Sequence, residues 1–141
     1  MSENQKKIWI TGASSGIGKA VAEKFAQEGW KVAVSARRKE LLDEIAKNQN
    51  ITSFPLDVTN QNQINNVFKR ILSEFGDLDI CLFSSGTYEP KDEQSVDPDK
   101  IKNVFNVNFL GVIDCVKAVE DYFKDKKSGH ISIVSSIAGY R

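Results

Sequence analysis

The chain has 141 residues, and its 19 basic and 19 acidic side chains give a formal net charge of +0. This balance lacks the positive excess that indicates a nucleic-acid or anionic-membrane partner. Hydrophobic residues make up 40% of the chain, which suffices for the core of one domain. No apolar run is long enough to span a bilayer, and the first residues lack the apolar core of a signal peptide. We therefore expect one globular, cytoplasmic domain over residues 1–141.

The two cysteines show no spacing typical of a metal or redox site. Cys81 lies in an apolar run and Cys115 in a helical pattern, and neither belongs to a C-x-x-C motif. We expect two buried, reduced thiols, which suits the cytoplasm, and no metal site.

The stretch 11–18, T-G-A-S-S-G-I-G, organises the N-terminal part of the chain. It follows the apolar run 8–10 and opens a helical pattern, so a strand leads through a glycine-rich turn into a helix. Unpaired N–H groups and the helix dipole make such a helix start an anion site. An ordinary turn is the alternative, but the flanking strand and helix favour a dinucleotide phosphate cradle. The predicted contacts are Gly12, Ser14, Ser15, Gly16, Ile17 and Gly18, with glycines that allow a sharp turn, approach of a pyrophosphate and close packing of helix on strand.

Strands and helices are predicted to alternate along the whole chain. Apolar runs predict strands at 8–10, 31–35, 51–56, 78–83 and 130–134, and helical patterns predict helices at 15–28, 40–47, 60–75 and 97–124. Asp97 followed by Pro98 is typical of a helix start, Pro55 suggests an edge strand, and 88–96 is predicted to be a surface loop. The alternation implies right-handed crossovers and an α/β, doubly wound parallel sheet with strand order 3-2-1-4-5.

The unusual residues follow the carboxyl ends of the predicted strands. They are Gly12, Arg37, Asp57, Gly86 and Ser136, one after each strand. In open parallel sheets, ligands bind beyond these ends at the point where the strand order reverses. The convergence is stronger evidence for a ligand site than any single motif.

The residues after the second strand indicate which dinucleotide binds. A carboxylate that holds the ribose 2′-OH of NAD is expected about 20 positions past the glycines, but this region reads S-A-R-R at 35–38. A guanidinium instead pairs bidentately with a 2′-phosphate. We therefore predict that Arg37 or Arg38 binds the 2′-phosphate of NADP(H), with NAD(H) the weaker ligand. The alternative is two solvated arginines at a helix start.

The spacing T-G-x-x-x-G-x-G resembles that of the short-chain dehydrogenase/reductase family, whose domain is of the Rossmann type. The resemblance makes Arg37 the first choice for the arginine that binds the 2′-phosphate and Arg38 the second. The resemblance implies that Asp57 binds the adenine amine with help from the backbone of Val58; a turn-forming or capping Asp57 is the alternative. It also implies that Ser85 and Gly86 lie along the cofactor through their backbone. Where the family usually has N-N-A-G, this chain has F-S-S-G at 83–86.

Asn108 interrupts an apolar helical stripe. A buried amide needs hydrogen-bond partners, so Asn108 either braces the backbone of a neighbouring strand or has a functional role. The segment V-N-F-L-G at 107–111 resembles the family's V-N-x-x-G, which implies that Asn108 belongs to the catalytic tetrad and holds a water of the proton relay. The stripe comprises Ile101, Val104, Phe105, Asn108, Val112, Val116 and Val119.

The segment S-S-I-A-G at 135–139 resembles the family's S-S-x-A-G, whose second serine is catalytic. This implies that Ser136 donates a hydrogen bond to the substrate oxygen and stabilises the charge that develops there. No His and Asp arrangement points to a nucleophilic serine. The family's Y-x-x-x-K lies beyond this serine, and Tyr140 does not fit it.

The resemblance covers essentially all of the chain but about half of the family's domain. It implies an oxidoreductase that transfers hydride between NADP(H) and a small carbonyl compound or secondary alcohol, and that forms a homo-oligomer. We expect the chain itself to be truncated after strand five, and therefore inactive. A non-catalytic, redox-sensing dinucleotide-binding module and a non-functional truncated product are the alternatives.

Overall fold

The computed structural model describes residues 5–88 and 96–137, and these form one parallel sheet with the predicted order β3-β2-β1-β4-β5. Tyr140 and residues 89–95 of the predicted loop lie outside the described residues. The elements along the chain are β1 (Lys7–Thr11), α1 (Gly16–Gln27), β2 (Lys31–Ser35), α2 (Lys39–Ile45), β3 (Ile51–Ser53), α3 (Gln61–Phe75), β4 (Ile80–Phe83), α4 (Pro98–Phe105), a π-helical turn (Asn106–Leu110), α5 (Gly111–Lys126) and β5 (His130–Ile133).

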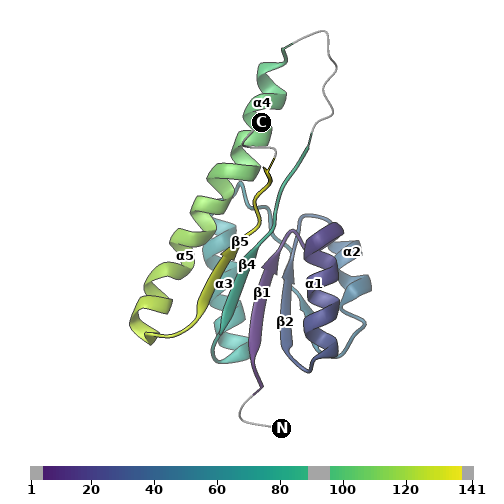
Figure 1. Ribbon diagram of the computed structural model, residues 1–141, viewed down its shortest axis with the longest axis vertical. Coiled ribbons are helices and arrows are strands. Elements are labelled where there is room, and N and C mark those ends of the chain that lie inside the picture. The colour runs from purple at the N-terminus through teal and green to yellow at the C-terminus, as the bar shows by residue number, and fades with distance from the viewer. Residues whose placement is uncertain (1–4, 89–95, 138–141) are drawn as a thin grey trace.

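Helices cover both faces of the sheet, as Figure 1 shows, and alternate strand residues supply the two cores. Ile8 and Ile10 pack on the side of α1 and α2, whereas Trp9 packs on the side of α3 and α5. The Trp9 ring stacks on Phe68 at 6.0 Å between centroids and meets Phe83 edge-on at 5.8 Å. The doubly wound α/β fold predicted from the alternation is therefore confirmed.

Strand β3 lies at the edge of the sheet, as Pro55 predicts, but it ends at Ser53 and not at residue 56. The chain still follows β2 beyond that point, because the N–H groups of Phe54 and Leu56 donate to carbonyl oxygens of β2 and of Ala36 just after it. Pro55, which has no N–H, falls between these two donors. An edge position therefore lets the proline interrupt the ladder without the loss of an inward hydrogen bond.

The helix predicted over 97–124 consists of three parts, because a π-helical turn separates α4 from α5. Asp97 caps α4 as predicted, since its Oδ1 accepts hydrogen bonds from the N–H groups of Asp99 and Lys100. Figure 1 shows α4 standing above the carboxyl ends of the strands. None of its residues is buried, and Ile101 and Phe105 of the predicted stripe are 57% and 53% exposed.

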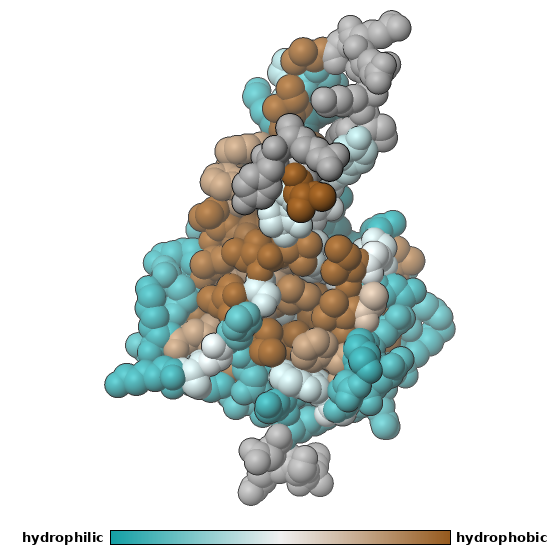
Figure 2. Space-filling view, viewed as in Figure 1, coloured by the Kyte–Doolittle hydropathy of each residue, from teal (hydrophilic) through white to brown (hydrophobic). Residues whose placement is uncertain are grey.

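Strand β5 forms the other edge of the sheet and is the least covered strand. On the side of α1 and α2, Ile80 and Leu82 of the neighbouring β4 are half-buried. Figure 2 shows apolar side chains gathered over this part of the face. On this face, Ile80 and Leu82 thus lack the full helical cover that the apolar side chains of β1 and β2 have.

Both cysteines lie in the core between the sheet and α5. Burial raises the pKa of Cys115 to about 12, and it raises the pKa of Cys81 well above its usual value. The prediction of buried thiols is confirmed, and neither thiol is a nucleophile at neutral pH. In the part of the chain that the structure describes, no helix has the length and hydropathy needed to cross a membrane.

Candidate functional site

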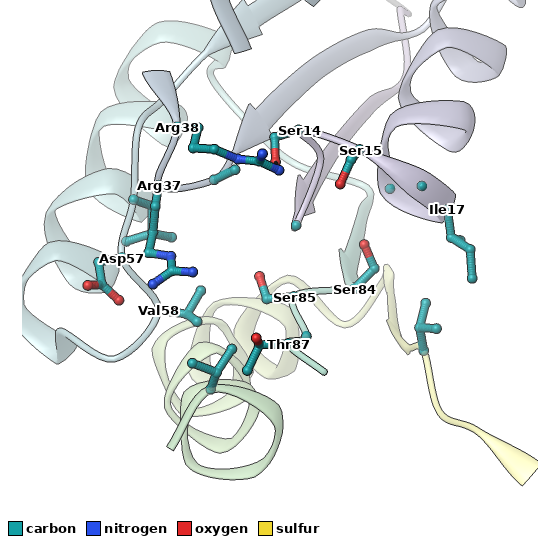
Figure 3. A pocket seen from close by; sticks show the side chains of 18 of the residues that line it. Ser14, Ser15, Ile17, Arg37, Arg38, Asp57, Val58, Ser84, Ser85 and Thr87 are labelled. Atoms are coloured by element: carbon teal, nitrogen blue, oxygen red, sulfur yellow. Dashed lines mark hydrogen bonds between the residues drawn. The ribbon is translucent and has the colours of Figure 1, made fainter. Parts of the chain in front are cut away.

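A cleft of about 450 Å³ opens at the carboxyl ends of the strands, beside the β1–β4 junction where the strand order reverses. All of the residues predicted to bind the cofactor line it (Figure 3). The lining comprises Gly12, Ser14, Ser15, Gly16, Ile17, Gly18, Ala36, Arg37, Arg38, Leu56, Asp57, Val58, Ser84, Ser85, Gly86, Thr87, Tyr88, Val107 and Val134. Residues that follow the ends of all five strands thus surround one cavity.

The glycine turn leaves no room for side chains at two of its positions. A Cβ on Gly18 would lie 2.4 Å from the Gly12 carbonyl oxygen, and one on Gly12 would lie 2.5 Å from the Ser84 carbonyl oxygen. Gly12 also has a φ of +67°, which L side chains rarely adopt. A Cβ on Gly16 would instead meet no described atom within 4 Å. The turn is therefore packed toward the sheet and open toward the cleft, which fits a bound pyrophosphate.

The start of α1 faces the cleft through Gly16, Ile17 and Gly18. Ser15 occupies the N-cap position, and among the described residues its side chain accepts no capping hydrogen bond. The first N–H groups of a helix have no partner within the helix, and the dipole places partial positive charge there. These donors are available to an anion in the cleft.

The two arginines after β2 lie on the same wall but point differently. The Arg38 guanidinium donates a hydrogen bond to the Ser14 hydroxyl, with 3.3 Å between Nη2 and Oγ. Figure 3 shows Arg37 beside Asp57 and Val58, away from Ser14. Both arginines are exposed. A cationic wall therefore joins the glycine turn to the segment after β3.

Asp57 shapes the turn that leads into α3 and also lines the cleft. Its Oδ1 accepts hydrogen bonds from Thr59 N–H at 2.9 Å and from the Thr59 hydroxyl at 2.7 Å. The cap of α3 is Asn60, whose Oδ1 accepts from the Gln63 N–H at 3.1 Å. The turn-forming interpretation of Asp57 is therefore confirmed and its capping interpretation is wrong; contact with adenine stays a prediction.

Asn108 is exposed, so the prediction that it faces the interior is wrong. The stripe that contains it continues into α4, none of whose residues is buried. Its amide instead pairs with the backbone of Thr87, donating from Nδ2 to the carbonyl oxygen at 2.8 Å and accepting at Oδ1 from the N–H at 2.7 Å. Asn108 therefore braces the backbone of the segment after β4, as the bracing interpretation expected, although this segment is not part of a strand. Asn108 does not itself line the cleft, and its place in a catalytic proton relay stays a prediction.

The long helix approaches the cleft floor closely at the end of its π-helical turn. A Cβ on Gly111 would lie 3.0 Å from both Cγ2 and the carbonyl oxygen of Val58. The glycine of the V-N-x-x-G segment thus allows the helix to contact a cleft residue. Val107, in the same segment, lines the cavity.

Ser136 lies beyond β5, exposed and outside the lining of the cleft. Val134, two residues earlier, does line it. The structure therefore brings the chain near Ser136 to the cleft, while a catalytic role for Ser136 itself stays a prediction.

One Y-x-x-x-K spacing does occur within the chain. Tyr122 and Lys126 lie on one face of α5, where they hold the backbone just before β4. The Leu78 N–H donates to the Tyr122 hydroxyl at 2.9 Å, and Lys126 Nζ donates to the Leu78 carbonyl oxygen at 2.7 Å. This end of the sheet is opposite the cleft, so the pair is structural and supplies no acid or base to the site.

The sequence did not indicate several further residues of the cleft wall. They lie within or next to the predicted segments, at positions for which no cofactor contact is predicted: Ala36, Leu56, Ser84, Thr87, Tyr88, Val107 and Val134. No cluster of three or more potential metal ligands occurs among residues 5–88 and 96–137.

Comparisons with known proteins agree with this geometry. A family model described as short chain dehydrogenase matches residues 6–141. The chain is 32% identical over 141 residues to dehydrogenase/reductase SDR family member 7 of Mus musculus, covering 94% of this chain and 42% of the mouse protein. It is 30% identical over 138 residues to an uncharacterized oxidoreductase of Staphylococcus epidermidis, covering 96% of this chain and 60% of that protein.

Solved structures show the same fold. A variant of ElxO with NADPH bound superimposes with a TM-score of 0.89 at 28% identity, covering 98% of this chain and 58% of that one. A short-chain dehydrogenase from Streptomyces avermitilis gives a TM-score of 0.87 at 30% identity, covering 100% and 53%. The chain thus spans roughly half the length of these proteins. It belongs to the short-chain dehydrogenase/reductase family of oxidoreductases.

Proposed function

We propose that this chain is the cofactor-binding part of an NADP(H)-dependent oxidoreductase that acts on a small carbonyl compound or secondary alcohol. The observation that carries the proposal is the cleft, in which an open glycine turn, a helix start and two arginines line one cavity. The solved relatives with NADPH and with NADP bound support a nicotinamide cofactor. When bound, this cofactor supplies or accepts the hydride.

In this proposal, different residues of the cleft bind different parts of the cofactor. The N–H groups at the start of α1 and the turn at Gly12 bind the pyrophosphate. Arg37 and Arg38 bind the 2′-phosphate, with Arg38 oriented by its hydrogen bond to Ser14. Asp57 binds the adenine amine. Ser85 and Gly86 contact the cofactor through their backbone.

Two further residues are proposed to act at the end of the cofactor where hydride is transferred. Ser136 polarises the substrate oxygen by donating a hydrogen bond to it. Both amide atoms of Asn108 are engaged by the Thr87 backbone, so its side chain supports the reaction by fixing the position of residues 86–87. The small substrate, the homo-oligomer and the cytoplasmic location belong to the same proposal, and the buried thiols are compatible with a reducing compartment.

The cofactor preference is tested by titrating the chain with NADPH and NADH and following cofactor fluorescence. Because one charged hydrogen bond contributes about 1.5–3 kcal/mol, Arg37→Asp and Arg38→Asp should each weaken NADPH binding by roughly tenfold to a hundredfold. NADH binding should change by less than about threefold, since NADH has no 2′-phosphate. Arg70→Asp, on the exposed face of α3, is the control. Equal losses for the two cofactors would contradict the proposal.

A further inference from the structure

Ser84 lies at a junction of three segments that meet at the glycine turn. Its hydroxyl donates a hydrogen bond to the carbonyl oxygen of Thr11, with 2.7 Å between the two oxygen atoms. Thr11 is the last residue of β1 and pairs with Phe83, the last residue of β4. The hydroxyl therefore continues the contact between these strands one residue past the point where the ladder ends.

The same hydroxyl is close to the start of α1. A Cβ placed on Gly18 would lie 2.7 Å from Ser84 Oγ, and one placed on Gly12 would lie 2.5 Å from the Ser84 carbonyl oxygen. Ser84 thus contacts the end of β1, the glycine turn and the first turn of α1 from one side. Its position fixes how far these three parts stand from one another.

The hydrogen bond to Thr11 also affects the orientation of the next peptide unit. The carbonyl of Thr11 and the N–H of Gly12 belong to the same rigid plane. Gly12 then adopts a φ of +67°, and its own carbonyl oxygen packs against Gly18. A donor held on the Thr11 carbonyl therefore restrains the turn whose open side lines the cleft.

We propose that Ser84 is a positioning residue for the pyrophosphate part of the cofactor site, acting through the glycine turn. The inference rests on the proposed function. It differs from a role in overall stability, because the restrained atoms are those of the turn and the start of α1. Loss of the hydroxyl should weaken the binding of ligands that reach the glycine turn. It should not affect the binding of ligands that contact only the cationic wall.

The test compares two ligands in two variants. NADPH contains the pyrophosphate, whereas adenosine 2′-monophosphate carries the 2′-phosphate and adenine without it. Ser84→Ala removes the donor and should raise the Kd for NADPH by about tenfold, which corresponds to about 1.4 kcal/mol, with the Kd for adenosine 2′-monophosphate within about twofold of the starting value. Ser84→Thr keeps a hydroxyl and should restore NADPH binding. Ser53→Ala, on the edge strand β3, is the matched control and should change neither.

Hydrogen exchange of the free chain gives a second measurement that needs no cofactor. Ser84→Ala should accelerate exchange of the amides between Gly12 and Gly18 relative to those of β2. Equal weakening of both ligands, unchanged exchange in the turn, or failure of Ser84→Ala to fold would overturn the inference. If the unaltered chain binds neither ligand while exchange in the turn responds to Ser84→Ala as expected, the proposed function fails but the restraint by Ser84 stands.

Discussion

The two halves of the sheet differ in how completely helices cover them. In β1 and β2, every residue after the first is buried, with α1 and α2 on one side and α3 on the other. In β5 the two outer residues are exposed and the two inner ones half-buried, while α4 has no buried residue. The first half is therefore well packed, whereas the second half offers apolar surface that nothing in the described chain covers.

The difference coincides with a division of the proposed site. The glycine turn and both arginines belong to the well-packed half, which holds the adenosine and pyrophosphate parts in the proposal. Asn108 and Ser136, assigned to the reacting end, are exposed residues of the other half. We infer that cofactor affinity depends on the first half and that the chemistry depends on the second.

The largest effect is expected from the core of the well-packed half. Trp9 is fully buried, and its indole N–H donates to the Ser35 hydroxyl at 2.9 Å. Trp9→Ala should lower the free energy of unfolding by about 3–5 kcal/mol. Phe105→Ala, at a side chain that is 53% exposed on α4, should lower it by less than about 1 kcal/mol. Urea denaturation followed by circular dichroism measures both, and equal losses would contradict the difference in packing.

A large effect on binding is expected from crowding at Gly18. A Cβ there would lie 2.4 Å from the Gly12 carbonyl oxygen, so Gly18→Ala should displace the turn and reduce NADPH affinity by more than about tenfold. Gly29→Ala is the control, because a Cβ at that position meets no described atom within 4 Å, although the φ of +83° is strained. The control should lose some stability but no affinity. NADPH titration measures the affinity, and thermal unfolding measures the stability. An unchanged NADPH affinity in Gly18→Ala would show that a Cβ at this position does not displace the glycine turn.

An intermediate effect is expected at Asn108. Asn108→Leu removes two hydrogen bonds to the Thr87 backbone and gains no burial, because the side chain is exposed. At about 0.5–1.5 kcal/mol for each bond, the loss of stability should be about 1–3 kcal/mol. Hydrogen exchange should accelerate at the Thr87 amide and remain slow in β2. Unchanged hydrogen exchange at the Thr87 amide would show that the two hydrogen bonds between Asn108 and Thr87 do not form in solution.

The smallest effect is expected from an exposed ion-pair cluster on α5. Hydrogen bonds from Lys117 and Lys124 lower the pKa of Glu120 from 4.5 to about 2. Because the folded pKa is depressed, the contribution to stability is present above pH 4.5 and is lost as the pH falls through about 2. Solvent screening keeps it small. Between pH 5 and pH 2, the urea midpoint of the unaltered chain should fall slightly more than that of Glu120→Gln. An identical fall in both would show that the ion pairs of Glu120 do not contribute to the pH dependence of stability.

The sequence predicted the strand order and the main wall of the cleft because both follow from local patterns. Alternating apolar runs and helical stripes define the crossovers, and parallel strands bring residues such as Gly12, Arg37 and Asp57 to one edge. Boundaries were less accurate where side-chain pattern and backbone pairing differ. Around Pro55 the apolar run continues, while the regular ladder ends at Ser53.

The errors concern features that depend on what lies opposite a residue. Periodicity placed Asn108 on an apolar face, but it does not tell which part of that face another element covers: Val119 of the same stripe is fully buried, whereas Asn108 is exposed. The hydrogen bond between Ser84 and Thr11 joins residues 73 positions apart, and no local pattern encodes it. The spacing of Tyr122 and Lys126 resembles a catalytic motif, yet only the fold shows that the pair lies at the opposite end of the sheet.

Binding of NADP(H) in the cleft at the carboxyl ends of the strands underlies the whole proposal. The most direct test is NADPH titration of the isotopically labelled chain, with each backbone amide followed by NMR. We predict the largest chemical-shift changes at 12–18, 36–38, 57–58 and 84–87, with little change around Leu78 and Tyr122. Absence of shifts at saturating NADPH, or shifts centred on the Leu78 end of the sheet, would contradict the claim.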